Sequence, residues 1–418
     1  MADIIILADD LTGAADSAAA CMWHGLSASV VLHSSRRSET TWPLSDLVSI
    51  DANTRCLSAS DAAATTSHIV RIWHENGALP PGCLLFKKLD STMRGHFAAE
   101  LAAILRQLRA MAPDQEKPCI VMAPALPSQG RTTIGAIQML HGRPIHEAGI
   151  PALLAQEGLS CRTIDIATVR AVSPALQHSM LRFSRVADVL VCDAESDEDL
   201  HRIAEASMIL HDRAVWAGSA GMVAQLPQAA GLAINTRTAQ PIAFEPGPTL
   251  FVVGSFASVS REQANFLSAV SKVATLHFQM TSHLSSFDPL LDALLSKRDA
   301  LLVLDQYERC SERDADSFAR TIAQFVTSIA PLLGGVVATG GETARTLLDA
   351  LGIRGLRLVC EVEPGIPFSI AENWIHPLPI ITKAGGFGSR ESLLRCREFL
   401  QVLQRSSAFP HASTPPVS

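Results

Sequence analysis

The sequence has few aromatic residues, no excess of positive charge and no long apolar run, and each absence argues against a class of protein. Phe, Trp and Tyr make up 5% of the 418 residues, and the formal net charge is −7. No Lys/Arg-rich run with interleaved aromatic residues occurs, so we expect no nucleic-acid partner. No apolar stretch reaches the roughly 20 residues that span a bilayer, so we expect no membrane association.

Cysteine pairs with the spacing of metal or redox motifs are also absent. The nine cysteines are scattered along the chain and contain no CxxC pair. An odd, dispersed set that falls mostly in apolar segments predicts reduced, buried thiols. The N-terminus enters an apolar strand at Ile4 without a basic leader. These features indicate a cytoplasmic protein without a signal peptide.

The common nucleotide-binding signatures are missing as well. The sequence has no GxxxxGK[ST], which argues against a P-loop NTPase, and no clean GxGxxG opens either half. Apolar material, in contrast, is plentiful, since 48% of the residues are hydrophobic and 18% are charged. A chain of this length and composition predicts two domains with proper cores.

Apolar strand-like segments alternate with helical segments in both halves, and polar residues gather where strands end. This pattern predicts an α/β protein with a doubly wound, mostly parallel sheet in the N-terminal domain. We expect this domain at 1–235, a linker at 236–247, a second α/β domain at 248–405 and a disordered tail at 406–418. The predicted strands are 3–8, 29–33, 47–51, 118–123, 163–166, 187–193, 214–217, 249–253, 301–304, 335–339, 356–362 and 378–382, besides one that begins at Leu85.

The stretch Leu85–Glu100 carries the densest chemistry. It runs from an apolar strand through a turn with lysines, an aspartate, hydroxyls and an arginine into a helix. Strand ends in open α/β sheets bind ligands because the loops there expose N–H groups and helix N-termini. The cationic side chains can bind a ligand carboxylate, and the aspartate and hydroxyls can bind ligand alcohols. The turn therefore predicts a site for a small polyhydroxylated acid. The alternative is an exposed loop in which Ser91 or Thr92 caps a helix.

Two further strand ends in the N-terminal half carry charged side chains. Asp9 and Asp10 precede a helix, where one carboxylate can cap the helix while the other faces the crevice as a base or hydroxyl acceptor; the sequence does not say which. Arg55 follows the strand 47–51 and can clamp a carboxylate with two hydrogen bonds, although alone it is more typical of a surface arginine. The proline-flanked segment 124–133 predicts either a plain turn or a rigid wall of the same cleft.

Four predicted strand ends in the second half carry glycine-dense turns, at 254–258, 340–343, 363–367 and 383–388. Glycine lets the backbone approach a phosphate closely, and N–H groups at a helix start favour the anion. The set therefore predicts phosphate binding. Lys383 can neutralise phosphate charge and Glu342 can hold Mg²⁺ directly or through water, but each is also compatible with a solvated surface position.

Taken together, seven motifs resemble the four-carbon acid sugar kinase family, formerly classed as a domain of unknown function. They occur in the family's order and span nearly the whole chain. The resemblance implies a sugar-acid-binding N-terminal domain, a nucleotide-binding C-terminal domain and ATP-dependent phosphorylation of a tetronate at its terminal (C4) hydroxyl, with Mg²⁺. The motifs are ADDLTGAAD (8–16), KKLDSTMRG (87–95), PALPSQGRTT (124–133), GSFASVSREQ (254–263), GGETA (340–344), EPGIP (363–367) and KAGGFG (383–388).

The central loop narrows the resemblance to one branch of the family. The 3-oxo-tetronate kinases carry a cysteine-containing version of this loop and a longer segment after the GRTT sequence. This chain has neither feature, so it is more similar to the D-threonate or D-erythronate kinases. We expect D-threonate as the substrate, with D-erythronate and 3-oxo-tetronates as alternatives.

The resemblance and the residue chemistry together assign site residues. Asp90 is the expected catalytic carboxylate, with Asp9 and Asp10 as alternatives. The expected substrate-binding residues are Asp9, Asp10, Arg55, Lys88, Asp90, Ser91 and Arg94. The expected ATP-binding residues are Ser258, Gly340, Gly341, Glu342, Thr343, Glu363, Pro364, Gly365, Ile366, Lys383, Gly385, Gly386 and Gly388.

Two readings from other classes remain open. A nucleotide-gated sugar-acid sensor would bind both ligands without turnover. A nicotinamide-dependent dehydrogenase would act on the same acids, although the missing dinucleotide fingerprint weighs against it. The sequence is also compatible with a homo-oligomer.

Overall fold

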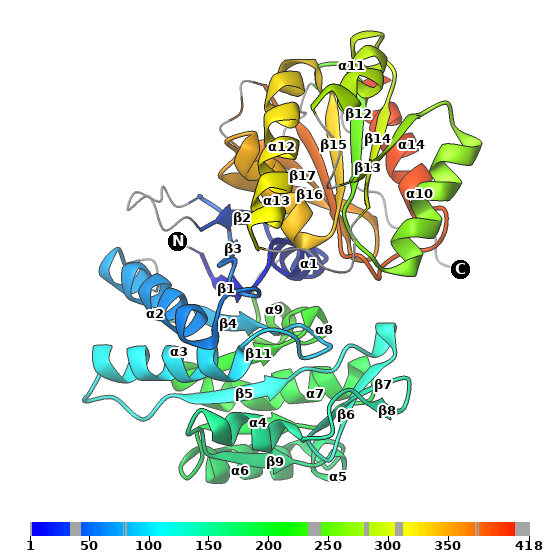
Figure 1. Ribbon diagram of the computed structural model, residues 1–418. Helices are drawn as coiled ribbons and strands as arrows, with labels where there is room; N and C mark the ends of the chain where they lie inside the picture. Colours follow the sequence, from blue (N-terminus) through cyan, green and yellow to red (C-terminus); the bar gives the residue numbers. More distant parts are fainter. Residues whose placement is uncertain are drawn as a thin grey trace. The chain divides into compact units, whose positions relative to one another are not determined.

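The computed structural model describes residues 2–33, 43–77, 79, 82–232, 244–279, 284–305, 312–372, 374 and 376–405. The chain divides into two compact units, Met1–Asn235 and Thr236–Ser418 (Figure 1). Most of the expected linker 236–247 and all of the expected tail 406–418 lie outside the described residues.

The first unit is built on a parallel sheet. Its described strands follow the order β2-β3-β1-β4-β11-β5-β10-β9, and every neighbouring pair is parallel. The strands are short, apolar and buried, as expected for a parallel sheet covered on both faces. This confirms the predicted α/β class. The strands are β1 (Ile4–Ala8), β2 (Ala28–Leu32), β3 (Leu47–Asp51), β4 (Leu84–Lys88), β5 (Cys119–Ala123), β9 (Cys161–Ile164), β10 (Val189–Cys192) and β11 (Ala214–Gly218).

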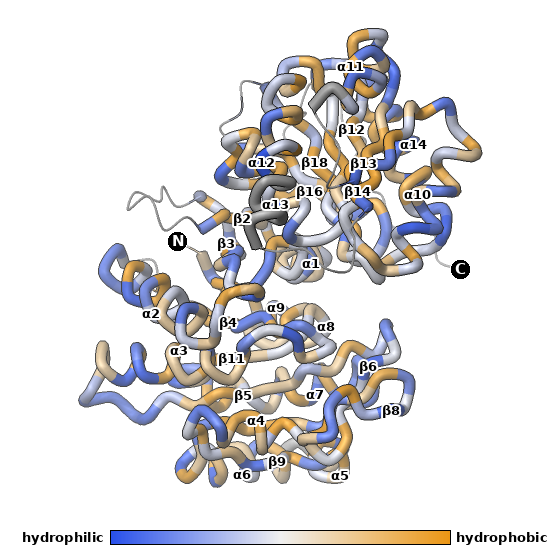
Figure 2. Tube along the Cα trace, viewed as in Figure 1, coloured by the Kyte–Doolittle hydropathy of each residue, from blue (hydrophilic) through white to orange (hydrophobic). Residues whose placement is uncertain are grey.

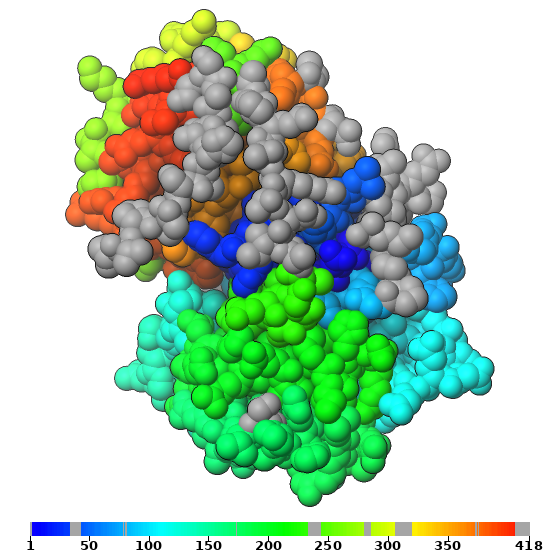
Figure 3. All heavy atoms as spheres, turned by 180° about the vertical axis from the view of Figure 1, so that it is seen from behind, coloured from blue at the N-terminus to red at the C-terminus, as the bar shows by residue number. Residues whose placement is uncertain are grey.

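Helices cover both faces of this sheet (Figure 1). The helices α2, α3 and α4 share a buried core with one face, to which Val70, Leu101 and Leu154 belong. The helices α1 and α6 to α9 contact the other side, and Figure 3 shows from behind the continuous green surface that α7 and its neighbours form. The helices are α1 (Leu11–Met22), α2 (Ala59–Glu75), α3 (Phe97–Met111), α4 (Ile150–Gln156), α5 (Ile166–Val169), α6 (Ser173–Ser184), α7 (Asp197–Ser207), α8 (Ala220–Val223) and α9 (Leu226–Ala229), with 3-10 turns at Pro127–Gln129 and Met208–Arg213.

The strand order of the first unit reverses between β1 and β4. The chain leaves β1 toward β2 and β3 on one side and leaves β4 toward β5 on the other, while β1 and β4 are neighbours. In open α/β sheets, ligands bind outside the carboxyl ends of the strands at such a reversal. The polar residues that follow β1 and β4 therefore lie where this fold forms its binding crevice.

The segment 124–133 is not a plain loop. It forms a short 3-10 turn and then enters a small antiparallel sheet, β6 (Arg131–Ile134), β7 (Ile137–Leu140) and β8 (Arg143–Pro144). This sheet was not predicted, because its strands are too short and too polar to show an alternating pattern. We call it the small sheet.

The second unit contains a mixed sheet with the order β13-β14-β12-β15-β18-β17-β16. The strands β13, β14, β12, β15 and β18 run parallel to one another, and β17 runs antiparallel to β18 and β16. Figure 2 shows hydrophobic residues concentrated along strands such as β14. The strands are β12 (Thr249–Val253), β13 (Ala274–Gln279), β14 (Ala300–Asp305), β15 (Gly335–Thr339), β16 (Gly355–Glu363), β17 (Ile366–Glu372) and β18 (Pro379–Lys383).

Helices again cover both faces of this sheet. The helices α10 and α14 share a core with Phe251 and Val337, and α12 and α13 pack together on the other side. The helices are α10 (Ser258–Val270), α11 (Asp288–Leu295), α12 (Glu312–Ile329), α13 (Gly341–Ala350) and α14 (Ser392–Arg405), with 3-10 turns at Leu284–Phe287 and Ala330–Leu332. Here the strand order reverses between the neighbours β12 and β15.

The strands β13 and β17 were not predicted. The outer strand β13 is only partly buried and therefore lacks a continuous apolar run. The segment 363–367 was expected as a glycine-dense turn at a strand end that binds phosphate, and in the structure Pro364 and Gly365 form the hairpin between β16 and β17.

The described cysteines differ in their burial. Among the described cysteines, Cys21, Cys119, Cys192 and Cys396 are buried, whereas Cys56 is exposed, contrary to the expectation of burial. No helix in the described ranges is both long and apolar enough to cross a membrane.

Candidate active site

Three neighbouring strands bring the predicted substrate residues together in the first unit. Asp9 and Asp10 follow β1, Asp90 follows β4, and Arg55 follows β3. The backbone N–H groups of Thr54 and Arg55 both donate to the carbonyl of Asp9, at 2.9 and 3.2 Å, so the loop after β3 is fixed against the end of β1. We call this group of side chains the carboxylate cluster.

The structure separates the roles of the two adjacent aspartates. Asp10 is the N-cap of α1, because its Oδ1 accepts a hydrogen bond from the backbone N–H of Gly13 at 2.8 Å. Its Oδ2 accepts from the hydroxyl of Thr12 at 2.8 Å. Asp9 has no capping bond and instead pairs with Arg55, whose Nε and Nη2 donate to its two oxygens at 2.8 Å each.

Arg55 is the centre of this cluster. Besides its two bonds to Asp9, its Nη1 donates to Asp10 at 2.6 Å and lies 3.6 Å from Asp90 Oδ2. The guanidinium therefore compensates three carboxylates. Its donors are largely used inside the protein, so it orients the aspartates rather than standing open as a clamp for a ligand carboxylate.

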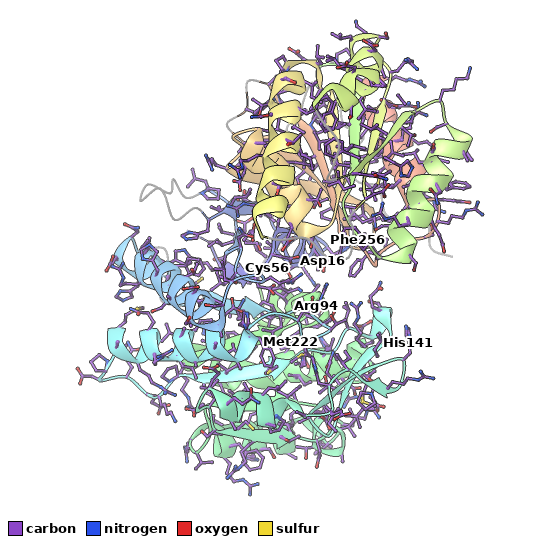
Figure 4. The ribbon with its side chains drawn as sticks, viewed as in Figure 1. Asp16, Cys56, Arg94, His141, Met222 and Phe256 are labelled. Carbon is purple, nitrogen blue, oxygen red and sulfur yellow. The ribbon has the colours of Figure 1, made fainter. Side chains whose placement is uncertain are left out.

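Asp90 is held at the start of the turn after β4. Its Oδ1 accepts from the N–H and the hydroxyl of Thr92, both at 2.7 Å. Its Oδ2 accepts from Arg94 Nε at 2.6 Å and forms an ion pair with Arg94 Nη2 at 2.5 Å. The Asp90 side chain is 6% exposed, whereas that of Arg94 is 68% exposed, so Arg94 is the accessible partner of this pair (Figure 4).

The charges of the cluster set the pKa values of its aspartates. Burial raises the pKa of a carboxyl, but the charge and hydrogen bonds of Arg55 outweigh burial at Asp9, whose pKa is lowered. The pKa of Asp10 is raised, because burial and the Asp9 carboxylate outweigh Arg55. At Asp90, Arg55, Arg94 and the bonds from Thr92 outweigh burial and lower the pKa to about 2. Asp90 is therefore an anion at neutral pH.

The two lysines of the central motif differ in role. Lys87 is fully buried and pairs with Glu100 at 3.1 Å, and Glu100 also accepts from the hydroxyl of Thr54 at 2.6 Å. Lys87 therefore belongs to the packing between β4 and α3. Lys88 is 6% exposed and its Nζ donates to the carbonyl of Leu89 at 2.8 Å, on the cluster's side of the strand end.

Backbone strain surrounds the carboxylate cluster. Asn53 and Met93 have positive φ values of 53° and 60°, and residues other than glycine seldom adopt this backbone conformation. Gly95 has φ 82°, and a Cβ there would lie 3.0 Å from Asp9 Oδ2, so only glycine fits. Such strain at converging loops is typical of functional sites.

Two residues of the small sheet contact the turn after β4, next to the carboxylate cluster, and were not among the expected site residues. Arg131 Nη1 donates to Ser91 Oγ at 2.7 Å. Gln138 Nε2 donates to the carbonyls of Ser91 and Pro124, at 2.9 and 3.2 Å. The only signal in the sequence was the arginine and hydroxyls of the segment 124–133, which we read as a wall without naming a residue.

Three of the four predicted glycine turns converge in the second unit. Gly254 and Gly340 follow the neighbouring strands β12 and β15, and Gly385 follows β18. A Cβ on Gly254 would overlap Thr343 Oγ1, a Cβ on Gly385 would overlap Ser255 Oγ, and Gly340 has φ 95°. The backbones approach one another where α10 begins at Ser258 and α13 begins at Gly341. Helix N-termini with close glycine backbones fit phosphate groups.

The fourth turn supports this arrangement from the side. Glu363, at the end of β16, accepts from Ser392 Oγ and Arg395 Nη1, both at 2.5 Å. Gly365 N donates to Glu361 at 2.7 Å, and Ile366 is buried in β17. Residues 363–366 thus tie the hairpin to α14 and open no helix.

Lys383 is a buried support for the glycine loop. It is fully buried, and its Nζ donates to the carbonyls of Ala384, Gly385 and Phe387 at 2.9, 3.3 and 3.0 Å. Burial lowers its pKa to about 8. The sequence was compatible with Lys383 as a phosphate-neutralising group or as a solvated surface residue. The structure shows a third arrangement, in which the Lys383 ammonium holds the 384–388 loop in shape.

The remaining candidates lie around these turns. Glu342 is exposed in the first turn of α13, and the described residues contain no group of three His, Cys, Asp or Glu side chains that could hold a metal ion. Phe256 is 55% exposed before α10, with the Arg261 guanidinium 5.3 Å from its ring centre (Figure 4). Arg261 is fixed by Asp305 at 2.8 Å.

Comparisons with known proteins identify both units of the chain. A family model described as a sugar-binding N-terminal domain matches residues 4–226, and one described as a nucleotide-binding C-terminal domain matches residues 250–393. A solved structure from Salmonella typhimurium, described as a putative tRNA synthase, has a TM-score of 0.75 at 20% identity, covering 95% of this chain and 99% of that one. Haemophilus influenzae protein HI1011 has a TM-score of 0.70 at 18% identity, covering 95% and 100%. These two structures show the fold.

Curated relatives match over nearly their whole length. A D-threonate kinase from Cupriavidus necator is 32% identical over 414 residues, covering 93% of this chain and 96% of the relative. A D-threonate kinase from Bordetella bronchiseptica is 30% identical over 418 residues, covering 95% and 97%. A D-erythronate kinase from Heliobacterium modesticaldum is 24% identical over 457 residues, covering 98% and 100%. The chain therefore belongs to the four-carbon acid sugar kinase family and is a sugar-acid kinase.

Proposed function

We propose that this kinase transfers the γ-phosphoryl group of ATP to the terminal (C4) hydroxyl of D-threonate. Three relatives named D-threonate kinase, at 27–32% identity over at least 93% of this chain, support the choice of substrate. The observation that carries the proposal is the carboxylate cluster at the reversal of strand order, where Asp9, Asp10 and Asp90 meet cationic side chains.

The first unit binds the acid in this proposal. A short hydroxy acid needs cations for its carboxylate and oriented acceptors for its hydroxyls. Lys88 and the exposed Arg94 supply positive charge, and Ser91 supplies a hydroxyl. Asp9 and Asp10, held in place by Arg55, accept hydrogen bonds from the substrate hydroxyls.

Asp90 is the proposed catalytic carboxylate. Phosphoryl transfer is catalysed mainly by positioning and charge neutralisation, so an anionic oxygen that orients the attacking hydroxyl suffices. One oxygen of Asp90 is fixed by Thr92 and the other is shared with Arg94. When Arg94 turns to the substrate carboxylate, Asp90 Oδ2 becomes free to accept the C4 hydroxyl proton. Asp9 and Asp10 remain the alternatives.

The second unit binds ATP in this proposal. The turns after β12, β15 and β18 hold the phosphates, through the N-termini of α10 and α13, and Phe256 offers an exposed ring for the base. Glu342, exposed in the first turn of α13, would hold Mg²⁺, which would neutralise phosphate charge when bound.

A substrate panel tests the proposal. Purified protein with Mg·ATP is given D-threonate, D-erythronate, L-threonate and their 3-oxo forms in a coupled assay for ADP release. We expect the highest kcat/KM with D-threonate. A higher kcat/KM with D-erythronate or a 3-oxo form would show that this compound, and not D-threonate, is the preferred substrate. ADP release that no tetronate stimulates, together with tight tetronate binding, would favour the sensor.

A further inference from the structure

The cationic side chains at the carboxylate cluster differ in how their charge is compensated. Arg55 contacts three carboxylates, and Arg94 contacts Asp90. Among the described residues, neither Lys88 nor Arg131 forms an ion pair. Two positive charges therefore lie near the cluster without a direct ion pair, although the charge of Lys88 acts on Asp9 and Asp10.

Arg131 is only partly satisfied by the protein. Its Nη1 donates to Ser91 Oγ at 2.7 Å, whereas its Nε is buried and has no hydrogen-bond partner in the described part of the chain. Burial lowers its pKa, an effect that Arg94 reinforces and that Asp90 and Asp16 oppose from a distance. A desolvated guanidinium with an unused donor raises the free energy of the empty site, and an anion that binds there removes this cost.

The backbone around Arg131 is rigid. Its N–H and carbonyl are both bonded to Leu126, at 3.1 and 2.8 Å, and β6 pairs with β7. Two bonds between Thr133 and Ala194, at 2.8 and 3.0 Å, join β6 to the end of β10. The carboxylate of Asp193 accepts from the N–H groups of Gly135 and Ala136 at 2.8 Å each. The small sheet thus holds Arg131 in a fixed position, as a binding group requires.

We infer that Arg131, together with Lys88, binds the carboxylate of the acid substrate. Arg55 was the expected clamp, but its donors serve Asp9 and Asp10. Arg131 stands next to the same loop through Ser91, has an unpaired donor and brings a planar fork that matches a carboxylate. The inference rests on the proposed function and extends it by naming the group that recognises the acid end.

Arg131→Met tests this inference, with Arg143→Met as the matched control. Arg143 is an exposed arginine on β8 of the same small sheet. We expect Arg131→Met to raise the KM for D-threonate roughly ten- to hundredfold, the effect of losing a charge-assisted hydrogen bond. The KM for ATP should stay within about twofold, and Arg143→Met should resemble the unchanged protein.

A neutral substrate separates carboxylate binding from a structural defect. D-Threitol has a hydroxymethyl group in place of the carboxylate of D-threonate. The ratio of kcat/KM for D-threonate over D-threitol should fall in Arg131→Met by about the factor lost on D-threonate. An equal loss on both compounds, or a KM for D-threonate within twofold of normal, would overturn the inference.

Two further measurements keep the test decisive. Calorimetric titration of D-threonate without ATP reports acid binding even if the unchanged protein phosphorylates no tetronate, so a failed function and a failed inference give different results. If Arg131→Met does not fold, Arg131→Lys retains the charge without the fork and should weaken D-threonate binding several-fold. Unaltered binding in that variant would contradict the role.

Discussion

Arg55 binds Asp9 through two parallel hydrogen bonds, from Nε to Oδ2 and from Nη2 to Oδ1, each 2.8 Å long. The pair joins the loop after β3 to the end of β1 and leaves Asp9 3% exposed. Such a bidentate pair fixes the planes of the Arg55 guanidinium and the Asp9 carboxylate. The geometry of the cluster therefore exists before any ligand binds.

Loss of Arg55 should therefore destabilise the first unit as well as impair catalysis. Arg55→Met leaves Asp9 and Asp10 as buried carboxylates without their hydrogen-bonded counter-charge, and we expect the free energy of unfolding to fall by about 3 kcal/mol, measured by urea denaturation. Adding Asp9→Asn should restore part of this loss. Arg71→Met, at an exposed ion pair of α2, is the control and should change stability by less than about 1 kcal/mol. Equal losses for both arginines would contradict this account.

Asp90→Asn should separate catalysis from nucleotide binding. The amide keeps the shape but loses the anionic oxygen that orients the attacking hydroxyl, so kcat should fall by about a hundredfold or more. The KM for ATP should change by less than about threefold, as measured by steady-state kinetics. Asp114→Asn, at an exposed position between α3 and β5, is the control. Turnover within a few-fold of normal would mean that Asp9 or Asp10, and not Asp90, is the catalytic carboxylate.

The glycine loop of the second unit offers a pair of adjacent residues for comparison. A Cβ at Gly385 overlaps Ser255 Oγ, whereas a Cβ at Gly386 has no atom within 4 Å. We expect Gly385→Ala to push apart the turns after β12 and β18 and to raise the KM for ATP roughly tenfold or more, while D-threonate binding is retained. Gly386→Ala should leave the KM for ATP within about threefold. The same KM in both variants would mean that these turns do not hold the nucleotide.

Lys383 makes the stability of the second unit depend on pH. Its pKa is lowered to about 8 from an ordinary value of 10.5, so the unfolded chain binds more protons than the folded one between these values. The penalty for burying the charged amine is fully present below pH 8 and disappears as the pH rises through 10.5. The free energy of unfolding of the unchanged protein, minus that of Lys383→Met, should therefore rise by roughly 3 kcal/mol across this window. A flat difference by urea denaturation at several pH values would show that the buried amine keeps its ordinary pKa.

Local patterns in the sequence were enough to predict the strands that are buried along their whole length. The predicted bounds of β3, β12 and β15 match the structure, because continuous apolar strands are encoded within a few residues. The choice between Asp9 and Asp10 could not be made, since it depends on Arg55, which is supplied by a different strand.

Arg131, which was not among the expected site residues, and Lys383, whose supporting role was not foreseen, share this dependence on distant partners. Arg131 contacts Ser91, which lies 40 positions earlier in the chain. Lys383 was considered for phosphate or for solvent, because nothing in its neighbouring sequence shows that the following carbonyls fold back around its amine. Composition and spacing indicated which strand ends matter, whereas the pairing of charges became visible only in three dimensions.

The small sheet is an appendage next to the proposed acid site, and it contacts the turn after β4 through Arg131 and Gln138. Its hairpins are anchored at one edge by Asp193 and by two bonds to Ala194, and they take no part in the eight-stranded parallel sheet. Insertions at its hairpin turns can therefore be accommodated without disturbing the parallel sheet. The residues next to the proposed acid site can thus change in one appendage while the strand ends that carry the aspartates stay in place.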